Sequence, residues 1–386
     1  MSAAPVRPLP LDRLRERTSE KWREYPADVL PLFVAESDFP LAPAVTTALR
    51  RAVELGDTGY TASRTPLAAA YADFAQRRFG WEVDPAGIRS TADVSLGIVE
   101  ILRRVTRPGD RVVITPPVYP PFYDLVDEAG AVVERVPLIA DSDGWQLDLP
   151  GIEAALAGGA RAVLLCSPHN PTGTVHPAEA LAALAELAER FGATVISDEI
   201  HAPLTYPDET FTPFLAASPV AAEIGFAVTS ASKAFNLAGL KCALMITAGE
   251  RPAAVVRGLP IEVEWRTGQF GMLAGTAAFS ADSDAWLDGV LVTLDRHRRL
   301  LAELLAEELP GARYRVPGAG YLAWIDLSAL GWGDDPARRI LREAKVALHF
   351  GPHFGEEGRG FVRLNFACAE EVLLEAVRRI GALARS

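Results

Sequence analysis

The fold class is indicated by residues 162–201, which read AVLLCSPHNPTGTVHPAEALAALAELAERFGATVISDEIH. Two short apolar runs, Ala162–Cys166 and Thr194–Ser197, flank the segment Pro177–Phe191, whose leucines share one face of a helix. The nearly continuous apolar character of the two runs is typical of strands that are buried on both faces of a sheet. A strand, a helix and a second strand at this spacing predict a mostly parallel, doubly wound sheet.

The same alternation of apolar runs and helical segments extends from about residue 90 to about residue 250. The other strands that we expect are Arg111–Thr115, Ala131–Pro137, Gly225–Ser230 and Ala243–Thr247. After residue 280 the pattern changes, because a long helical stretch, Asp284–Leu309, leads to short strands around 320–327 and 360–366 and to a helix from Glu370. We therefore expect an α/β protein with a three-layer large domain and a smaller α+β C-terminal domain.

The expected domain boundaries follow from these changes of pattern. Residues 1–44 form an N-terminal segment that packs with the small domain or with a partner. Residues 45–283 form the large domain, and residues 284–386 form the small one. A chain of 386 residues is long enough for two such domains.

Composition and charge exclude several function classes. The 38 lysines and arginines stand against 50 acidic residues, and a net charge of −12 argues against nucleic acid or an anionic membrane as the main partner. No run approaches 18 apolar residues, and Met1–Pro10 lacks the apolar core of a signal peptide. The three cysteines, Cys166, Cys242 and Cys368, match no metal-site spacing, so we expect reduced thiols, no metal and a cytoplasmic protein.

Polar residues suited to chemistry follow three of the expected strands. Asn170 stands between prolines in the loop after Ala162–Cys166, Asp198 follows the next strand, and Lys233 follows Gly225–Ser230. Ligands in such sheets bind beyond the carboxyl ends of the strands, where these residues meet. Each residue alone also fits a plain structural role, namely a proline-rich turn, a helix cap or a surface lysine.

Lysine is scarce in this chain, with only Lys21, Lys233, Lys241 and Lys345. The apolar, hydroxyl-flanked surroundings of Lys233 predict a depressed pKa and hence a free amine, which forms imines with aldehydes. If the intervening segment is helical, Lys241 lies two turns further on and offers a fixed charge to a phosphate.

Three motifs together carry a family resemblance: SPHNPTG at 167–173, SDEIH at 197–201 and SASKAFNLAGLK at 230–241. They resemble the motifs of fold-type I pyridoxal-phosphate (PLP) enzymes of the class I/II aminotransferase superfamily. Within it, they are similar to the MalY/PatB branch of cystathionine β-lyase-like C–S lyases. The resemblance covers essentially the whole chain, and it implies the PLP-dependent transferase fold type I and PLP as the cofactor.

The resemblance also implies a role for each matching residue around the cofactor. Lys233 is the lysine that binds PLP as an imine, and Asp198 pairs with the protonated pyridine nitrogen. Asn170 contacts the ring hydroxyl and the substrate, and His201 occupies the place of a tyrosine that touches the same ring oxygen in related aminotransferases. The residues that match phosphate contacts are Ser230, Lys241 and the backbone amides of Ser95 and Leu96 at the start of a helix.

Three further residues match positions around the cofactor and the substrate. Tyr119 corresponds to the aromatic residue that stacks on the cofactor ring. Tyr60 corresponds to a tyrosine that reaches the phosphate of the neighbouring subunit, which implies a homodimer with active sites at the subunit interface. Arg363 corresponds to the arginine that binds the substrate α-carboxylate through a bidentate fork.

The branch resemblance favours C–S β-elimination from L-cystathionine or a related cysteine S-conjugate, which yields a thiol, pyruvate and ammonia. An aminotransferase acting on an amino acid or a biosynthetic intermediate is the alternative, because the same residues serve both reactions. A ligand-sensing regulator of this fold is a third possibility, although such a protein more often lacks the lysine or carries a fused DNA-binding domain. The chain departs from the family pattern at Glu36, Ser37 and Pro203, which we expect near the substrate pocket.

Overall fold

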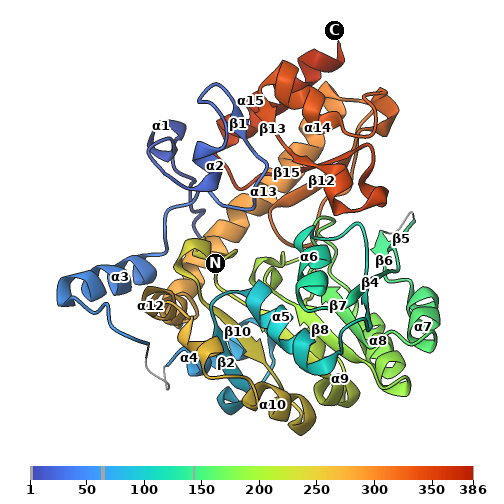
Figure 1. The fold of residues 1–386 in the computed structure, drawn as a ribbon. Coiled ribbons are helices and arrows are strands. Elements are labelled where there is room, and N and C mark those ends of the chain that lie inside the picture. Colours follow the sequence, from blue (N-terminus) through green and yellow to red (C-terminus); the bar gives the residue numbers. More distant parts are fainter. Residues whose placement is uncertain (1–2, 62–65, 142–143, 386) are drawn as a thin grey trace.

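The computed structural model describes residues 3–61, 66–141 and 144–385. Met1, Ser2 and Ser386, the outermost residues of the two terminal segments expected above, lie outside the described residues. Figure 1 shows a larger body built around one sheet and a smaller C-terminal body above it, with the long helix α13 (Asp284–Glu308) running between them.

The large body contains a seven-stranded sheet in the order β2–β10–β9–β8–β7–β3–β4. Its strands are β2 (Ile88–Thr91), β3 (Arg111–Ile114), β4 (Val132–Arg135), β7 (Ala162–Cys166), β8 (Thr194–Asp198), β9 (Gly225–Thr229) and β10 (Ala243–Ile246). The pairs from β9 to β4 are parallel, whereas β10 runs antiparallel to both of its neighbours. The predicted mostly parallel sheet is confirmed.

Helices cover both faces of this sheet, so its central strands are buried on both sides. Along β7, Val163 and Leu165 belong to one hydrophobic core, and Leu164 belongs to the other. The expectation of two-sided burial is wrong for β4, because β4 is an edge strand and Val132 is exposed.

Among the helices, α13, α8 (Ala178–Arg190) and α15 (Glu370–Ala384) lie at the three helical segments named from the sequence. The other α-helices are α1 (Leu11–Leu14), α2 (Glu20–Arg23), α3 (Pro43–Leu55), α4 (Leu67–Phe79), α5 (Val94–Val105), α6 (Pro121–Glu128), α7 (Leu149–Ala157), α9 (Pro219–Ile224), α10 (Glu250–Arg257), α11 (Glu262–Trp265), α12 (Gln269–Ala278) and α14 (Pro336–Arg339). No helix in the described ranges is long and apolar enough to cross a membrane.

The small body contains an antiparallel sheet in the order β11–β12–β15–β14. Its strands are β11 (Arg313–Tyr314), β12 (Leu322–Asp326), β14 (His349–Phe350) and β15 (Phe361–Asn365). The N-terminal strand β1 (Leu30–Pro31) pairs in parallel with β13 (Val346–Ala347), so the N-terminal segment lies against the small body. A further hairpin is formed by β5 (Ile139–Ala140) and β6 (Trp145–Gln146).

Candidate active site

The polar residues after the strands meet because β3, β7, β8 and β9 are consecutive in the sheet. Cys166 at the end of β7 is level with Asp198 at the end of β8, which is level with Val228 near the end of β9. The loops that follow these strands therefore leave the same edge of the sheet. They border a pocket of about 440 Å³, whose wall includes Ser95, Tyr119, Asn170, Asp198, His201, Ser232, Lys233, Lys241, His349 and Arg363.

Asp198 is a buried carboxylate without a cation. The amide of Ile200 donates to its Oδ1 over 3.1 Å, and none of the described side chains forms an ion pair with it. Burial raises the pKa of the carboxyl to about 7, and the Ile200 amide and the charge of Lys233 offset only part of this effect. A buried carboxylate at this position therefore suits a ligand that brings a positive charge, such as a protonated ring nitrogen.

Lys233 lies in the turn after β9, and its Nζ donates to the backbone carbonyl of Ala35 over 3.1 Å. Burial and the charge of Arg363 lower the lysine pKa to about 8, against the opposing charges of Glu36 and Asp198. A substantial fraction of the side chain is therefore the neutral amine near pH 8.

The segment between Lys233 and Lys241 is not a continuous helix, so the two lysines are not separated by two helical turns. Asn236 and Lys241 have φ angles of 57° and 55°, which interrupt any helix, and only the short 3₁₀ turn Ala238–Leu240 forms between them. Lys241 nevertheless borders the pocket, because the turn carries it back toward the start of α5.

Arg363 is held on three sides. Its Nη1 donates to Asn170 Oδ1 over 3.1 Å, and its Nη2 donates to the carbonyl of Phe33 over 2.9 Å. The same Nη2 lies 3.1 Å from His349 Nδ1, which must accept because a guanidinium only donates. Burial lowers the pKa of Arg363 to about 10, so the side chain remains charged at neutral pH and is positioned for an anion.

His349 was not identified from the sequence. It stands opposite Arg363 in the β14–β15 pairing, and no sequence pattern reveals a partner across two short strands. Burial, together with the charge of Arg363, lowers its pKa to about 3, so the ring stays neutral and can accept from the guanidinium.

His201 and Tyr119 also border the pocket. His201 is buried, and burial and Lys233 lower its pKa to about 3, so it is neutral. Its Nδ1 has no partner among the residues that the structure describes. Burial and Asp198 raise the pKa of Tyr119, whose ring packs edge-on against Phe122 with centroids 6.0 Å apart.

The start of α5 differs from the expectation. The amide of Leu96 is not free, because it donates to Oδ1 of the N-cap residue Asp93 over 2.8 Å. Lys241 Nζ lies 3.0 Å from Oδ2 of the same carboxylate. Ser95 and Lys241 border the pocket, whereas Leu96 does not, so the prediction for Leu96 is corrected.

Ser230 also does not border the pocket. Its hydroxyl is 2.6 Å from the carbonyl of Cys242 and 2.7 Å from Ser232 Oγ, and these contacts satisfy it within the protein. Ser232, two residues later, borders the pocket instead. The phosphate contact of Ser230 therefore stays a prediction, and Ser232 is a second candidate for the same contact.

Four expected residues lie outside the pocket wall of their own chain. Tyr60 is fully exposed beyond the end of α3. Glu36 accepts a hydrogen bond from Ser19 Oγ over 2.6 Å, and Pro203 borders a different cavity of about 740 Å³. Ser37 is buried, and neither it nor the other two departures from the family pattern borders the pocket.

The residues present fit PLP. The carboxylate of Asp198 lacks a cation that a pyridine nitrogen can supply, and Lys233 offers an amine of lowered pKa in the same pocket. Ser95 and Lys241 offer donors near the N-terminus of α5, where a phosphate is favoured, and Ser232 borders the same pocket. No group of three or more potential metal ligands occurs in the described part of the chain.

Comparison with known proteins agrees with this fit. A family model described as aminotransferase class I and II matches residues 27–380. A cystathionine β-lyase candidate of Mycobacterium leprae is 44% identical, with 99% of this chain and 98% of the relative covered, and the cystathionine β-lyase of Corynebacterium glutamicum is 34% identical over 97% and 98%. The crystal structure of a PLP-dependent β-cystathionase candidate from Corynebacterium diphtheriae superposes with a TM-score of 0.94, 34% identity and 99% coverage of both chains. The chain belongs to the class I and II aminotransferase family of PLP-dependent enzymes.

Proposed function

We propose that the protein is a PLP-dependent C–S β-lyase that cleaves L-cystathionine or a related cysteine S-conjugate to a thiol, pyruvate and ammonia. The observation that carries the proposal is the Lys233 amine, of lowered pKa, in one pocket with the cation-free carboxylate of Asp198. Two relatives that match more than nine-tenths of this chain are named cystathionine β-lyase, which supports elimination as the outcome.

The chain's own residues divide the work. PLP, when bound, withdraws electrons from the substrate Cα. The charged guanidinium of Arg363, which Asn170, Phe33 and His349 hold in place, binds the substrate carboxylate.

Proton transfer is assigned to Lys233. Its amine takes the proton from Cα, and a pKa near 8 keeps that amine available at neutral to mildly alkaline pH. Asp198 keeps the ring nitrogen protonated by pairing with it. Neutral His201 contributes a hydrogen-bonding nitrogen without adding charge.

An aminotransferase is the second candidate, because family membership and the same residues serve both outcomes. The test is incubation with L-cystathionine or a cysteine S-conjugate in the absence of an oxo acid, followed by measurement of pyruvate, ammonia and free thiol. We expect all three in equal amounts. Absence of pyruvate, together with amino transfer that requires an oxo acid, would overturn the lyase proposal.

A pair of lysine variants controls this assay. Lys233→Met removes the amine and is expected to abolish pyruvate release. Lys345→Met changes an exposed lysine of the small body and is expected to leave turnover unchanged.

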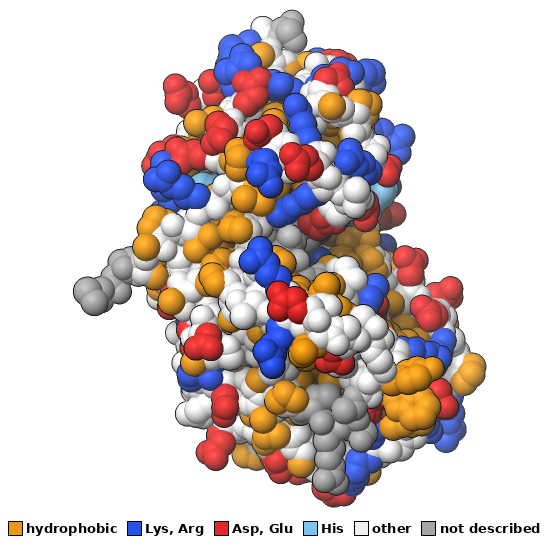
Figure 2. Space-filling view, turned by 90° about the vertical axis from the view of Figure 1, so that its left-hand side faces the viewer, with side chains coloured by type: hydrophobic (Ala, Val, Ile, Leu, Met, Phe, Trp, Pro, Cys, Tyr) orange, Lys and Arg blue, Asp and Glu red, His pale blue; other side chains and the backbone are white. Residues whose placement is uncertain are grey.

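We further propose a homodimer in which Tyr60 contacts the phosphate bound by the partner subunit. Tyr60 is fully exposed. Further exposed apolar side chains occur in residues 41–55, which precede it, and in residues 261–265, namely Leu41, Val53, Leu55, Ile261 and Trp265. Figure 2, which looks onto the side that carries α3, shows hydrophobic side chains gathered between charged ones. Such a surface supports burial against a second copy.

The dimer is tested by mixing Tyr60→Phe and Lys233→Ala subunits. In a hybrid, one site receives both defects and the other receives neither, so activity above that of either parent is expected. Hybrids that form without any regained activity would remove the cross-subunit role of Tyr60.

Two further proposals concern the roles of the two domains and the cellular location. Residues 45–283 are proposed to bind the cofactor, and residues 284–386 to contribute Arg363 to the substrate. A cytoplasmic location is proposed with them, because the three cysteines are free thiols, as a reducing compartment keeps them.

A further inference from the structure

Lys21 has no part in the proposed chemistry, yet its side chain is fully buried. It lies in α2, and its Nζ is 2.8 Å from Oδ1 of Asp38, whose side chain is 1% exposed. The same Nζ donates to the carbonyl of Glu36 over 3.2 Å. Stability alone does not account for such a pair, because two apolar side chains of similar size are often as stable as a buried ion pair.

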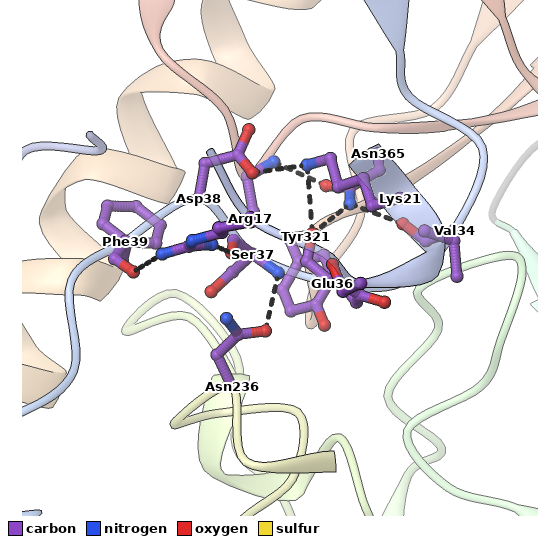
Figure 3. Close-up of polar contacts among 12 residues, drawn as sticks. Arg17, Lys21, Val34, Glu36, Ser37, Asp38, Phe39, Asn236, Tyr321 and Asn365 are labelled. Atoms are coloured by element: carbon purple, nitrogen blue, oxygen red, sulfur yellow. Dashed lines mark hydrogen bonds and ion pairs between the residues drawn. The ribbon is translucent and has the colours of Figure 1, made fainter. Parts of the chain in front are cut away.

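The pair belongs to a network around residues 33–39, which we call the strap. The strap forms no helix or strand, and side chains from other elements bind its backbone instead (Figure 3). The donors to its carbonyls are Arg17 to Ser37 and Phe39, Lys21 to Glu36, Asn365 to Val34 and Glu36, and Tyr321 to Ala35. The amide of Ser37 donates to Asn236 Oδ1 over 3.1 Å.

The other end of the strap faces the candidate active site. Phe33, Val34 and Ala35 border the pocket. The carbonyl of Ala35 accepts from Lys233 Nζ, and the carbonyl of Phe33 accepts from Arg363. The strap thus connects the buried ion pair to the two cations on which the proposed function depends.

We propose that Lys21 is a positioning residue, which through its ion pair with Asp38 holds the strap so that the Ala35 carbonyl meets the ammonium of Lys233. The functional meaning of this inference rests on the role proposed for Lys233. Lys21 itself touches neither substrate nor cofactor and acts through the strap.

The proposal has a measurable consequence at Lys233. A carbonyl that accepts from an ammonium group favours its charged form. When the strap shifts while Lys233 stays buried, the amine loses this acceptor and the nearby charge of Glu36, and the pKa of Lys233 falls. The neutral amine then becomes more abundant at pH 7, which raises its reactivity toward an amine-directed reagent.

The test uses the full chain without PLP, because bound PLP would occupy the Lys233 amine. In that form Lys233 borders the pocket, through which an acylating reagent can reach it. The main variant is Lys21→Met with Asp38→Leu, which removes both charges and leaves the net charge unchanged. Lys345→Met is the matched control, because it removes an exposed lysine. Peptide mass spectrometry measures the rate of Lys233 acylation between pH 6 and pH 10, and denaturant unfolding of the same samples reports stability.

We expect the double variant to unfold near the wild-type midpoint and its Lys233 to react roughly threefold to tenfold faster at pH 7. Asp38→Asn, which retains the shape of the side chain, is expected to give a smaller change in the same direction. Lys345→Met is expected to leave the acylation profile unchanged.

Two results would overturn the proposal. The first is a folded double variant whose Lys233 reacts at the wild-type rate at every pH. The second is a double variant that does not fold, since the pair would then be a requirement of the fold itself. Because acylation needs neither PLP nor substrate, a failure to release pyruvate would count against the lyase proposal and leave this result untouched.

Discussion

Asp198→Asn is expected to stabilise the cofactor-free protein and to weaken its binding of PLP. The substitution keeps an oxygen that can accept from the amide of Ile200, and it removes a carboxylate that is costly to ionise in a buried position. The folded protein is therefore freed from a destabilising charge, and the pyridine nitrogen loses its counter-ion.

The magnitude follows from the pKa of Asp198, which is about 7 in the folded protein against 3.8 ordinarily. Because the folded-state pKa is raised, the folded protein retains the proton while the unfolded chain loses it between pH 4 and pH 7. Wild-type stability therefore falls across that window and levels off above it. The advantage of the variant is about 2 kcal/mol at pH 5 and about 4 kcal/mol at pH 8.

The assay is urea unfolding of the cofactor-free wild type and variant at pH 5 and at pH 8. Buried groups whose pKa does not depend on the charge of Asp198, such as His169, are common to both proteins and cancel in the difference. Addition of PLP at pH 8 is expected to stabilise the wild type far more than the variant. A difference in unfolding free energy that is equal at the two pH values would refute the assignment of a raised pKa to Asp198.

Three further predictions concern the cations. Arg363→Lys is expected to raise the KM for the amino-acid substrate roughly tenfold to hundredfold with less effect on kcat, because a lysine cannot keep both the internal contacts and a carboxylate fork; an unchanged KM in steady-state assays contradicts it. Lys241→Met is expected to weaken PLP binding, since it removes the cation that offsets the Asp93 carboxylate near the proposed phosphate position; full PLP occupancy after dialysis contradicts it. Lys21→Met alone leaves Asp38 buried without a partner and is expected to cost about 3–5 kcal/mol of unfolding free energy, and an unchanged denaturation midpoint contradicts it.

Much of the fold follows from simple sequence patterns. Buried strands such as β7, β8 and β9 are apolar along their whole length, and their ends are recognisable because polar loop residues follow at once. Parallel strands bring their carboxyl ends to one edge, so Asn170, Asp198 and Lys233 were expected together before any side chain was placed. The direction of β10 was not predictable, since an apolar run reads the same in both directions.

The details of the phosphate end depend on local competition that the sequence does not reveal. Asp93 claims the Leu96 amide because an N-cap side chain binds the amide three residues on. Ser230 and Ser232 are two residues apart, and which hydroxyl faces the pocket depends on the turn between them. His349 was missed because its place opposite Arg363 depends on the pairing of two short strands. The strap was missed because it is defined by contacts between segments that are far apart in the chain.

The central claim is that Lys233 is the residue that carries PLP. Borohydride reduction of the PLP-loaded protein makes the bond between the cofactor and its lysine permanent, and peptide mass spectrometry then identifies the modified residue. The account predicts that the added mass lies on the peptide that contains Lys233, and that Lys233→Met removes it. Stoichiometric modification at Lys21, Lys241 or Lys345, or no modification at all, would contradict the account.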